Sequence, residues 1–187
     1  MVSPEVTPFF DEVTNTVTYV VADPETGQCA VIDPVLDYDL TAGRTSTTSV
    51  GAVIEFIEAN KLLLDIVLET HVHADHLSAA PVLKQRLQAK TAIGDHITAI
   101  QEVFTGIFNL DDVATDGSQF DVLLADGDTF PIGNIQAKVM HTPGHTPACV
   151  TLVIGDAAFV GDTLFMPDFG TARCDFPGGD AESLYDS

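Results

Sequence analysis

The chain has 187 residues, with 28 acidic against 7 basic side chains and a formal net charge of −21. This length suits one domain with a sizeable buried core, and 45% hydrophobic with 19% charged residues is the composition of a globular protein. So large an acidic excess disfavours nucleic acid and anionic membranes as partners, because both require clustered lysine and arginine.

Compartment and redox state are predicted from what the chain lacks. No apolar run approaches the roughly 18–20 residues needed to cross a bilayer. Residues 1–12 lack the basic and then apolar pattern of a secretory signal. The three cysteines, Cys29, Cys149 and Cys174, are odd in number and widely spaced, so they suggest neither a disulfide framework nor a CxxC metal motif. We therefore expect reduced thiols and a cytoplasmic protein.

The first half of the chain predicts alternating strands and helices. A hairpin, a helix, a buried strand and a second helix are expected in turn at 17–21 with 29–32, 49–60, 62–68 and 78–88. Ser49 is a natural N-cap for the first of these helices. The segment 37–49 between the hairpin and this helix is polar, and we expect a loop there.

The second half predicts mostly strands. Short strands are expected at 91–93, 122–124, 128–132, 135–140, 149–154 and 157–160, with an ambiguous, partly helical segment at 95–108 and a loop at 111–119. The pattern is mixed α and β, with sheets that helices must cover. Asp180 is a natural N-cap for 181–187, which would hold only about two helical turns. We expect 1–187 to be one domain without its C-terminal portion.

Half of the six histidines lie in one short stretch, directly after the predicted strand 62–68. His71, His73, Asp75 and His76 lie within six consecutive positions there. If the chain continues extended, alternate side chains point to one side, which brings His71, His73 and Asp75 together. Such a concentration is hard to explain as core packing and predicts a metal site.

Two later segments offer further ligands. His145 lies in the turn 141–147, which follows a predicted strand, and Asp162 comes just after another predicted strand. Loops at strand ends, carried on a rigid scaffold, are where functional side chains collect. We therefore expect these two residues to complete the metal site.

The three motifs together resemble those of the metallo-β-lactamase fold superfamily. In chain order they are His71-x-His73-x-Asp75-His76, Thr142-Pro143-Gly144-His145-Thr146 and Gly161-Asp162-Thr163. The resemblance covers nearly the whole chain. It implies an α+β four-layer αββα sandwich with a metal site at one edge of its two sheets.

A narrower resemblance is to the persulfide dioxygenase branch, which is related to glyoxalase II. It rests on segments 37–46, 142–151 and 170–176. It implies that one Fe(II), held by His71, His145 and Asp162, oxidises glutathione persulfide with O₂ to sulfite and glutathione. The thiol carrier is implied by the resemblance alone, and the resemblance leaves homodimer formation open.

The chemistry of these residues agrees with such a site. Two histidines and one carboxylate leave open positions on iron, as in non-haem Fe(II) oxygenases. His73, Asp75 and His76 would then orient the ligands and fix their tautomers. Arg173 is our candidate catalytic and substrate-binding residue, because an anionic thiol needs a local positive group on so acidic a chain.

Two alternatives stay open. A thioester hydrolase similar to glyoxalase II would hold two zinc ions and a bridging hydroxide. Its first site would use His71, His73 and His145, and its second Asp75 and His76, with Asp162 bridging. The second site usually takes one more histidine, and none follows His145, which favours a single metal ion, iron or zinc. The other alternative is a metal-binding module without catalytic activity.

Overall fold

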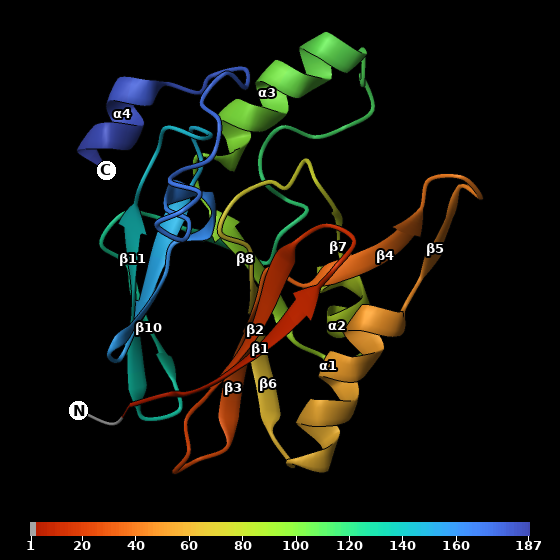
Figure 1. The fold of residues 1–187 in the computed structure, drawn as a ribbon, viewed down its shortest axis with the longest axis vertical. Helices are drawn as coiled ribbons and strands as arrows, with labels where there is room; N and C mark the ends of the chain where they lie inside the picture. Colours follow the sequence, from red (N-terminus) through yellow and green to blue (C-terminus); the bar gives the residue numbers. More distant parts are fainter. Residues whose placement is uncertain (1–2) are drawn as a thin grey trace. The chain divides into compact units, whose positions relative to one another are not determined.

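The structure is a computed structural model that describes residues 3–187 (Figure 1). Its internal contacts divide the chain into two compact units. The first unit comprises the residues up to Glu69 together with His73–Thr91 and Pro131–Gln136. The second comprises Thr70–Val72, Ala92–Phe130 and Ala137–Ser187. The chain therefore passes repeatedly from one unit to the other.

Four strands of the first unit lie side by side in the order β1-β2-β3-β6. They are β1 (Glu5–Asp11), β2 (Thr16–Ala22), β3 (Gln28–Ile32) and β6 (Leu63–Leu68). β1, β2 and β3 pair antiparallel, which confirms the predicted hairpin and adds the unpredicted β1. β3 and β6 run parallel, and parallel neighbours need a crossover, which α1 (Thr48–Ala59) supplies.

A second, three-stranded sheet of the first unit has the order β5-β4-β7. Its strands are β4 (Val35–Asp39), β5 (Arg44–Ser46) and β7 (Leu77–Ser78). The expected loop at 37–49 is therefore wrong, because β4 and β5 pair across it. The turn is stabilised by the Asp39 carboxylate, whose Oδ1 accepts the backbone N–H groups of Thr41 and Ala42 at 2.8 and 3.0 Å.

Two helices contribute to the core of the first unit. α1 begins at Thr48, so Ser49 is not its N-cap; the Ser49 hydroxyl instead donates to Asp37 Oδ1 at 2.6 Å. α2 (Ala80–Leu87) tolerates Pro81 because it lies in the first turn. Buried aliphatic side chains from the strands and both helices form the core, among them Val20, Val31, Val53, Ile57, Val67 and Leu83.

The first strands of the second unit are β8 (Lys90–Gly94) and β9 (Val122–Leu124). Only the last three residues of β8 belong to this unit. The two strands pair in parallel, and α3 (Ile97–Phe108) lies between them in sequence. The ambiguous segment 95–108 is therefore helical over most of its length. Its inner face packs in a cluster that comprises Ile93, Ile97, Ile100, Phe104, Phe120 and Ala148.

The remaining strands are neighbours in chain order. They are β10 (Thr129–Ile132), β11 (Ile135–His141), β12 (Val150–Ile154) and β13 (Ala157–Phe159). A short 3₁₀ helix, η1 (Gly161–Thr163), follows β13, and α4 (Ala181–Asp186) comes last. The Asp180 carboxylate accepts the Ser183 N–H at 2.7 Å, which confirms the predicted N-cap. The β11–β12 loop and η1 carry His145 and Asp162.

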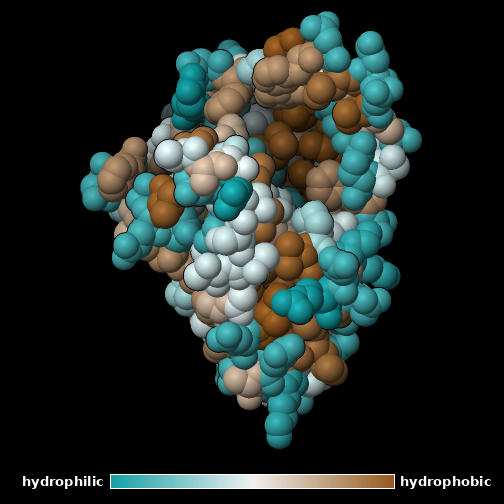
Figure 2. Space-filling model, turned by 90° about the vertical axis from the view of Figure 1, so that its right-hand side faces the viewer, coloured by the Kyte–Doolittle hydropathy of each residue, from teal (hydrophilic) through white to brown (hydrophobic). Residues whose placement is uncertain are grey.

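Acidic and apolar side chains share the surface. Figure 2 shows hydrophilic residues along much of the displayed face and hydrophobic residues gathered in patches between them. Ile107 and Phe108 on α3 are 52% and 60% exposed. Within residues 3–187, none of the helices has both the length and the apolar character that a membrane crossing requires.

The three cysteines are free thiols, as expected, and they differ in exposure. Cys29 is fully buried, and burial, with a smaller contribution from Asp65, raises the pKa of its thiol to about 12. Because the thiolate is the reactive form, we expect iodoacetamide at pH 8 to modify the half-buried Cys174 in the folded protein and to leave Cys29 intact. Peptide mapping by mass spectrometry checks this. Equal labelling of both residues before denaturation would contradict it.

Candidate metal centre

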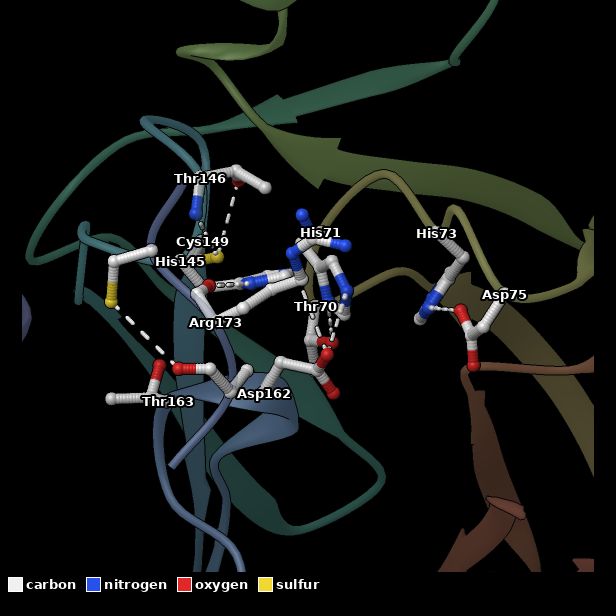
Figure 3. Close-up of polar contacts among 12 residues, drawn as sticks. Thr70, His71, His73, Asp75, His145, Thr146, Cys149, Asp162, Thr163 and Arg173 are labelled. Atoms are coloured by element: carbon white, nitrogen blue, oxygen red, sulfur yellow. Dashed lines mark hydrogen bonds and ion pairs between the residues drawn. The ribbon is translucent and has the colours of Figure 1, made fainter. Parts of the chain in front are cut away.

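Three side chains of the second unit converge on one point: His71, His145 and Asp162 (Figure 3). Asp162 Oδ2 lies 3.5 Å from His145 Nε2 and 3.8 Å from His71 Nε2. Bonds of about 2.0–2.2 Å from a metal to nitrogen or oxygen place two ligands of one ion about 3–3.5 Å apart. The three predicted ligands therefore fit one metal ion with only a small adjustment.

The backbone brings these ligands together from distant parts of the sequence. His71 comes three residues after β6, and the carbonyl of the preceding Thr70 accepts the N–H of Val150 at 2.9 Å. That bond ties the His71 segment to the first residue of β12. His145 lies in the loop before the same strand, and Asp162 lies in η1, three residues after the end of the hairpin partner β13.

Both histidines have their second ring nitrogen occupied. His145 Nδ1 lies 2.7 Å from the backbone carbonyl oxygen of Arg173, and His71 Nδ1 lies 3.0 Å from the Thr70 hydroxyl. A carbonyl can only accept, so His145 carries its proton on Nδ1, and the lone pair on Nε2 faces Asp162. Such contacts fix the tautomer and ring orientation of a metal ligand.

The Thr70 hydroxyl gives a direct test of this orientation. We expect Thr70→Val to weaken metal binding about 10- to 100-fold, the usual effect of removing a partner of a ligating histidine. Competition with a chromophoric chelator measures the affinity. Thr70→Ser, which keeps the hydroxyl, is the matched control and should bind nearly as the wild type does. An unchanged affinity in Thr70→Val would show that the bond does not support His71.

Burial of the three ligands is uneven. His71 and His145 are only 2% and 5% exposed, whereas the Asp162 side chain is 34% exposed. The imidazole rings are thus shielded from water, and the carboxylate forms the accessible edge of the site. A ligand reaching the metal would approach beside Asp162.

Two glycines permit the close packing around the ligands. Gly161 has φ +50°, and a Cβ there would lie 2.5 Å from Thr70 Oγ1. Gly144 has φ +140°, and its Cβ would lie 2.4 Å from the Cα of Leu184 in α4. Side chains at either position would be strained and would displace the segment that carries the adjacent ligand.

The segment 170–176 borders the site through its backbone and one ring. Ala172 N donates to the Asp162 carbonyl at 3.3 Å, and the Phe176 ring meets His145 edge to face at 5.2 Å. The Arg173 guanidinium donates twice to Asp175, at 2.5 and 2.8 Å, and lies 5.0 Å from the Phe176 ring centroid. Arg173 thus reaches His145 with its carbonyl, while its side chain is paired on the surface; contact with substrate stays a prediction.

The other residues of the histidine motif lie in the first unit, where they form their own cluster. His73 Nε2 lies 3.1 Å from both Asp33 Oδ1 and Glu69 Oε2, and Ser78 donates to the other Glu69 oxygen. Burial alone would lower the pKa of His73, but the two carboxylates outweigh it and raise this pKa well above its ordinary value. Burial raises the pKa of Glu69, against the opposing effect of His73.

The expected extended continuation of the strand through Asp75 is wrong. β6 ends at Leu68, and the chain bends at Thr70 and His71 and again over 74–76. The hydroxyl of Thr70 and the carboxylates that hold His73 impose local contacts that an extended strand would not make. The alternation of side chains therefore does not apply to this motif.

Asp75 and His76 complete the cluster of the first unit. Asp75 Oδ1 lies 4.0 Å from His73 Nδ1, and the His76 ring stacks on His73 at 4.2 Å. His76 Nε2 is buried without a hydrogen-bond partner among residues 3–187. One atom from each of His73, Asp75 and His76 lies within 4.8 Å of the others, so these groups could hold a second metal ion.

The groups that support the histidines of both clusters were not predicted from the sequence. Asp33 carried a signal, since it directly follows the predicted hairpin strand 29–32. Thr70 is adjacent to a ligand but is not distinguished by its type. The Arg173 carbonyl carries no signal, because every residue has one.

The family model described as the metallo-beta-lactamase superfamily matches residues 11–187. The chain belongs to this superfamily. Its expected α+β fold is thereby confirmed, and the clustered ligands support a metal cofactor.

Individual relatives carry different names. A Dictyostelium discoideum protein named glyoxylase B2 is 52% identical, over 90% of this chain and 59% of its own. The human mitochondrial persulfide dioxygenase ETHE1 is 32% identical, over 95% of this chain and 59% of its own. The crystal structure of ETHE1 from Myxococcus xanthus superimposes with a TM-score of 0.76 at 31% identity, over 97% of this chain and 67% of that one. The chain spans about half the length of the curated relatives it matches.

Proposed function

We propose that the protein is a mononuclear non-haem iron persulfide dioxygenase that converts glutathione persulfide, O₂ and water into glutathione and sulfite. The convergence of His71, His145 and Asp162 carries this proposal. Two histidines and one carboxylate are the ligand set of non-haem Fe(II) oxygenases. This set leaves open coordination positions for the persulfide and for O₂. Iron, when bound, would supply the electron transfer between sulfur and O₂.

The stoichiometry fits such a site. In RSSH + O₂ + H₂O → RSH + HSO₃⁻ + H⁺, the outer sulfur loses four electrons and O₂ gains them. The protein needs to bind and orient the persulfide and O₂ next to each other, and to protect the reacting sulfur from bulk water. The buried rings of His71 and His145 are shielded from water, and the side of the partly exposed Asp162 is open for the substrate to enter.

Arg173 is the proposed contact for the anionic substrate. The second unit contains one lysine and one arginine, Lys138 and Arg173, so positive charge near the triad is scarce. The Arg173 side chain is 65% exposed and paired with Asp175. A carboxylate of the substrate could replace Asp175 in this two-pronged pairing, because both present the same planar acceptor geometry.

Relatives support both this reaction and a competing one. The name persulfide dioxygenase belongs to proteins 31–32% identical to this chain, whereas glyoxylase B2 is 52% identical. Ligand composition, not overall identity, is our reason for preferring the dioxygenase. The triad contains no third histidine, whereas the first zinc site of the hydrolase alternative would use three, His71, His73 and His145.

Metal analysis with two activity assays tests the proposal. The protein, loaded anaerobically with Fe(II), should contain about one iron per chain and consume O₂ when glutathione persulfide is added, with sulfite as product. Zinc-loaded protein should not consume O₂. Hydrolysis of S-lactoylglutathione without any O₂ consumption would overturn the proposal.

The second candidate is a dinuclear zinc thioester hydrolase. It is favoured by the cluster of His73, Asp75 and His76, in which His76 Nε2 is buried and unpartnered among residues 3–187. Zinc would lower the pKa of bound water to about 7 and provide the nucleophile. Two zincs per chain, with thioester hydrolysis, would establish this function instead.

A further inference from the structure

The hydroxyls of three threonines near the ligands in sequence contact one another. Thr142 Oγ1 lies 3.1 Å from Thr151 Oγ1 and 3.2 Å from Thr163 Oγ1. Thr163 Oγ1 also donates to the Thr142 carbonyl at 3.5 Å. Thr142 and Thr151 are buried, at 4% and 6% exposure. We refer to Thr142, Thr151 and Thr163 as the hydroxyl cluster.

The members of the hydroxyl cluster come from the segments that carry two of the ligands. Thr163 directly follows Asp162 in η1, and Thr142 lies three residues before His145. Thr151 belongs to β12, whose pairing with β11 fixes where the His145 loop begins. The hydroxyl cluster therefore links the segment of Asp162 to the segment of His145 through side chains.

The hydrogen-bonding capacity of a hydroxyl makes this link sensitive to the positions of the three side chains. A hydroxyl has one proton to donate and two lone pairs that accept. The central Thr142 can therefore form hydrogen bonds with both Thr151 and Thr163 only when all three side chains are held in position. A shift of η1 along β12 would break the contact of Thr163 with Thr142. Because the distances are 3.1–3.2 Å, even a displacement of about 1 Å would exceed hydrogen-bond reach.

Burying a hydroxyl at these positions costs free energy unless the hydroxyl forms a hydrogen bond. Thr151 lies between two buried residues of β12, Val150 and Leu152, where valine would fill the same volume without a group that needs a partner. Its hydroxyl spends its interaction on Thr142. Thr142 in turn contacts Thr163 of η1, so the Thr151 hydroxyl acts on η1 through Thr142.

We propose that the hydroxyl cluster is a positioning device that holds the Asp162 carboxylate at the correct distance from His145 for metal binding. Thr142, Thr151 and Thr163 act through the backbone and do not touch the metal themselves. The inference rests on the triad binding a metal and not on the proposed dioxygenase reaction. The dioxygenase and the hydrolase function could therefore each be disproved without disproving the positioning role of the hydroxyl cluster.

Cobalt(II) provides a test that does not depend on activity. We expect Thr163→Val to lower Co(II) affinity about 10- to 100-fold, as removal of a ligand-supporting group does. The visible d–d absorption of the bound Co(II) should change in position or intensity. Thr163→Ser, which restores the hydroxyl, should recover both the affinity and the spectrum.

A second variant and a control exclude a general loss of folding. Thr151 is not adjacent in sequence to any of the three ligands, and Thr151→Val should weaken Co(II) binding in the same direction. Thr91→Val replaces another buried threonine, in β8 of the first unit, and should leave Co(II) binding unchanged. Thermal unfolding of each metal-free variant measures the structural cost separately.

Two results would overturn the proposal. One is wild-type Co(II) affinity and spectrum in both Thr163→Val and Thr151→Val. The other is an equal loss in Thr163→Ser and Thr163→Val, since that would assign the effect to the shape of the side chain and not to its hydroxyl.

Discussion

Replacing His145 with alanine is expected to lower metal affinity by more than about 100-fold and to abolish turnover of any substrate that needs the metal. Loss of a partner of a ligating histidine costs about 10- to 100-fold, so loss of one of three ligands should cost more. The substitution also leaves the Arg173 carbonyl without the Nδ1 proton that it accepts. Metal content after dialysis against a weak chelator, together with O₂ consumption, measures the effect.

A matched control separates loss of a ligand from loss of a histidine. The His96 side chain is 52% exposed and lies outside the triad, in the same unit. His96→Ala should therefore keep wild-type metal content and activity. If His145→Ala retained a full equivalent of metal, the ligand assignment of His71, His145 and Asp162 would be wrong.

The sequence was sufficient to single out the three residues that the structure brings together, because each lies in a motif of unusual composition. His71, His145 and Asp162 follow predicted strands, and rigid strands place such residues reproducibly. The buried strands β2, β3, β6 and β12 were also predictable, since runs of apolar, β-branched residues have few other uses.

What the sequence did not reveal depends on contacts between distant residues. β1 alternates weakly and carries Pro8, so its strand character comes from pairing with β2 and not from its own residues. The β4–β5 hairpin contains several polar residues and forms around the Asp39 turn. In the histidine motif, periodicity predicted one face, but the bonds of Thr70 and of His73 bend the chain.

The supporting groups of the site were least predictable. The path of the chain decides which backbone carbonyl, such as that of Arg173, lies beside a ligand. The identity of the side chain does not indicate it. Buried carboxylates were visible only as charges on a chain with 28 of them. Asp33 and Glu69 differ from the others because the fold buries them beside His73, at 7% and 3% exposure.

Replacing His73 with alanine is expected to destabilise the first unit without emptying the triad. The substitution removes the cation that Asp33 and Glu69 share, and removing one partner of a buried charge pair costs about 3–5 kcal/mol of unfolding free energy. Urea unfolding of the metal-free protein measures this cost. His73→Gln, which keeps an N–H donor for the carboxylates, should recover part of it.

Metal stoichiometry in the same variants separates the two candidate functions. His73 Nε2 is held by the two carboxylates, so in a dinuclear hydrolase it would bind metal through Nδ1. A mononuclear dioxygenase predicts about one metal per chain both in wild type and in His73→Ala. A hydrolase predicts two in wild type and fewer in the variant.

His76→Ala makes this comparison sharper because it removes the stability effect. His76 Nε2 has no hydrogen-bond partner among residues 3–187, and Nδ1 contacts the carbonyl of the neighbouring Leu77. We therefore expect little change in unfolding free energy. A dioxygenase would keep its single iron and its O₂ consumption in His76→Ala, whereas a hydrolase would lose its second zinc. Loss of one metal equivalent from a stable His76→Ala protein would assign the buried, unpartnered nitrogen to metal binding.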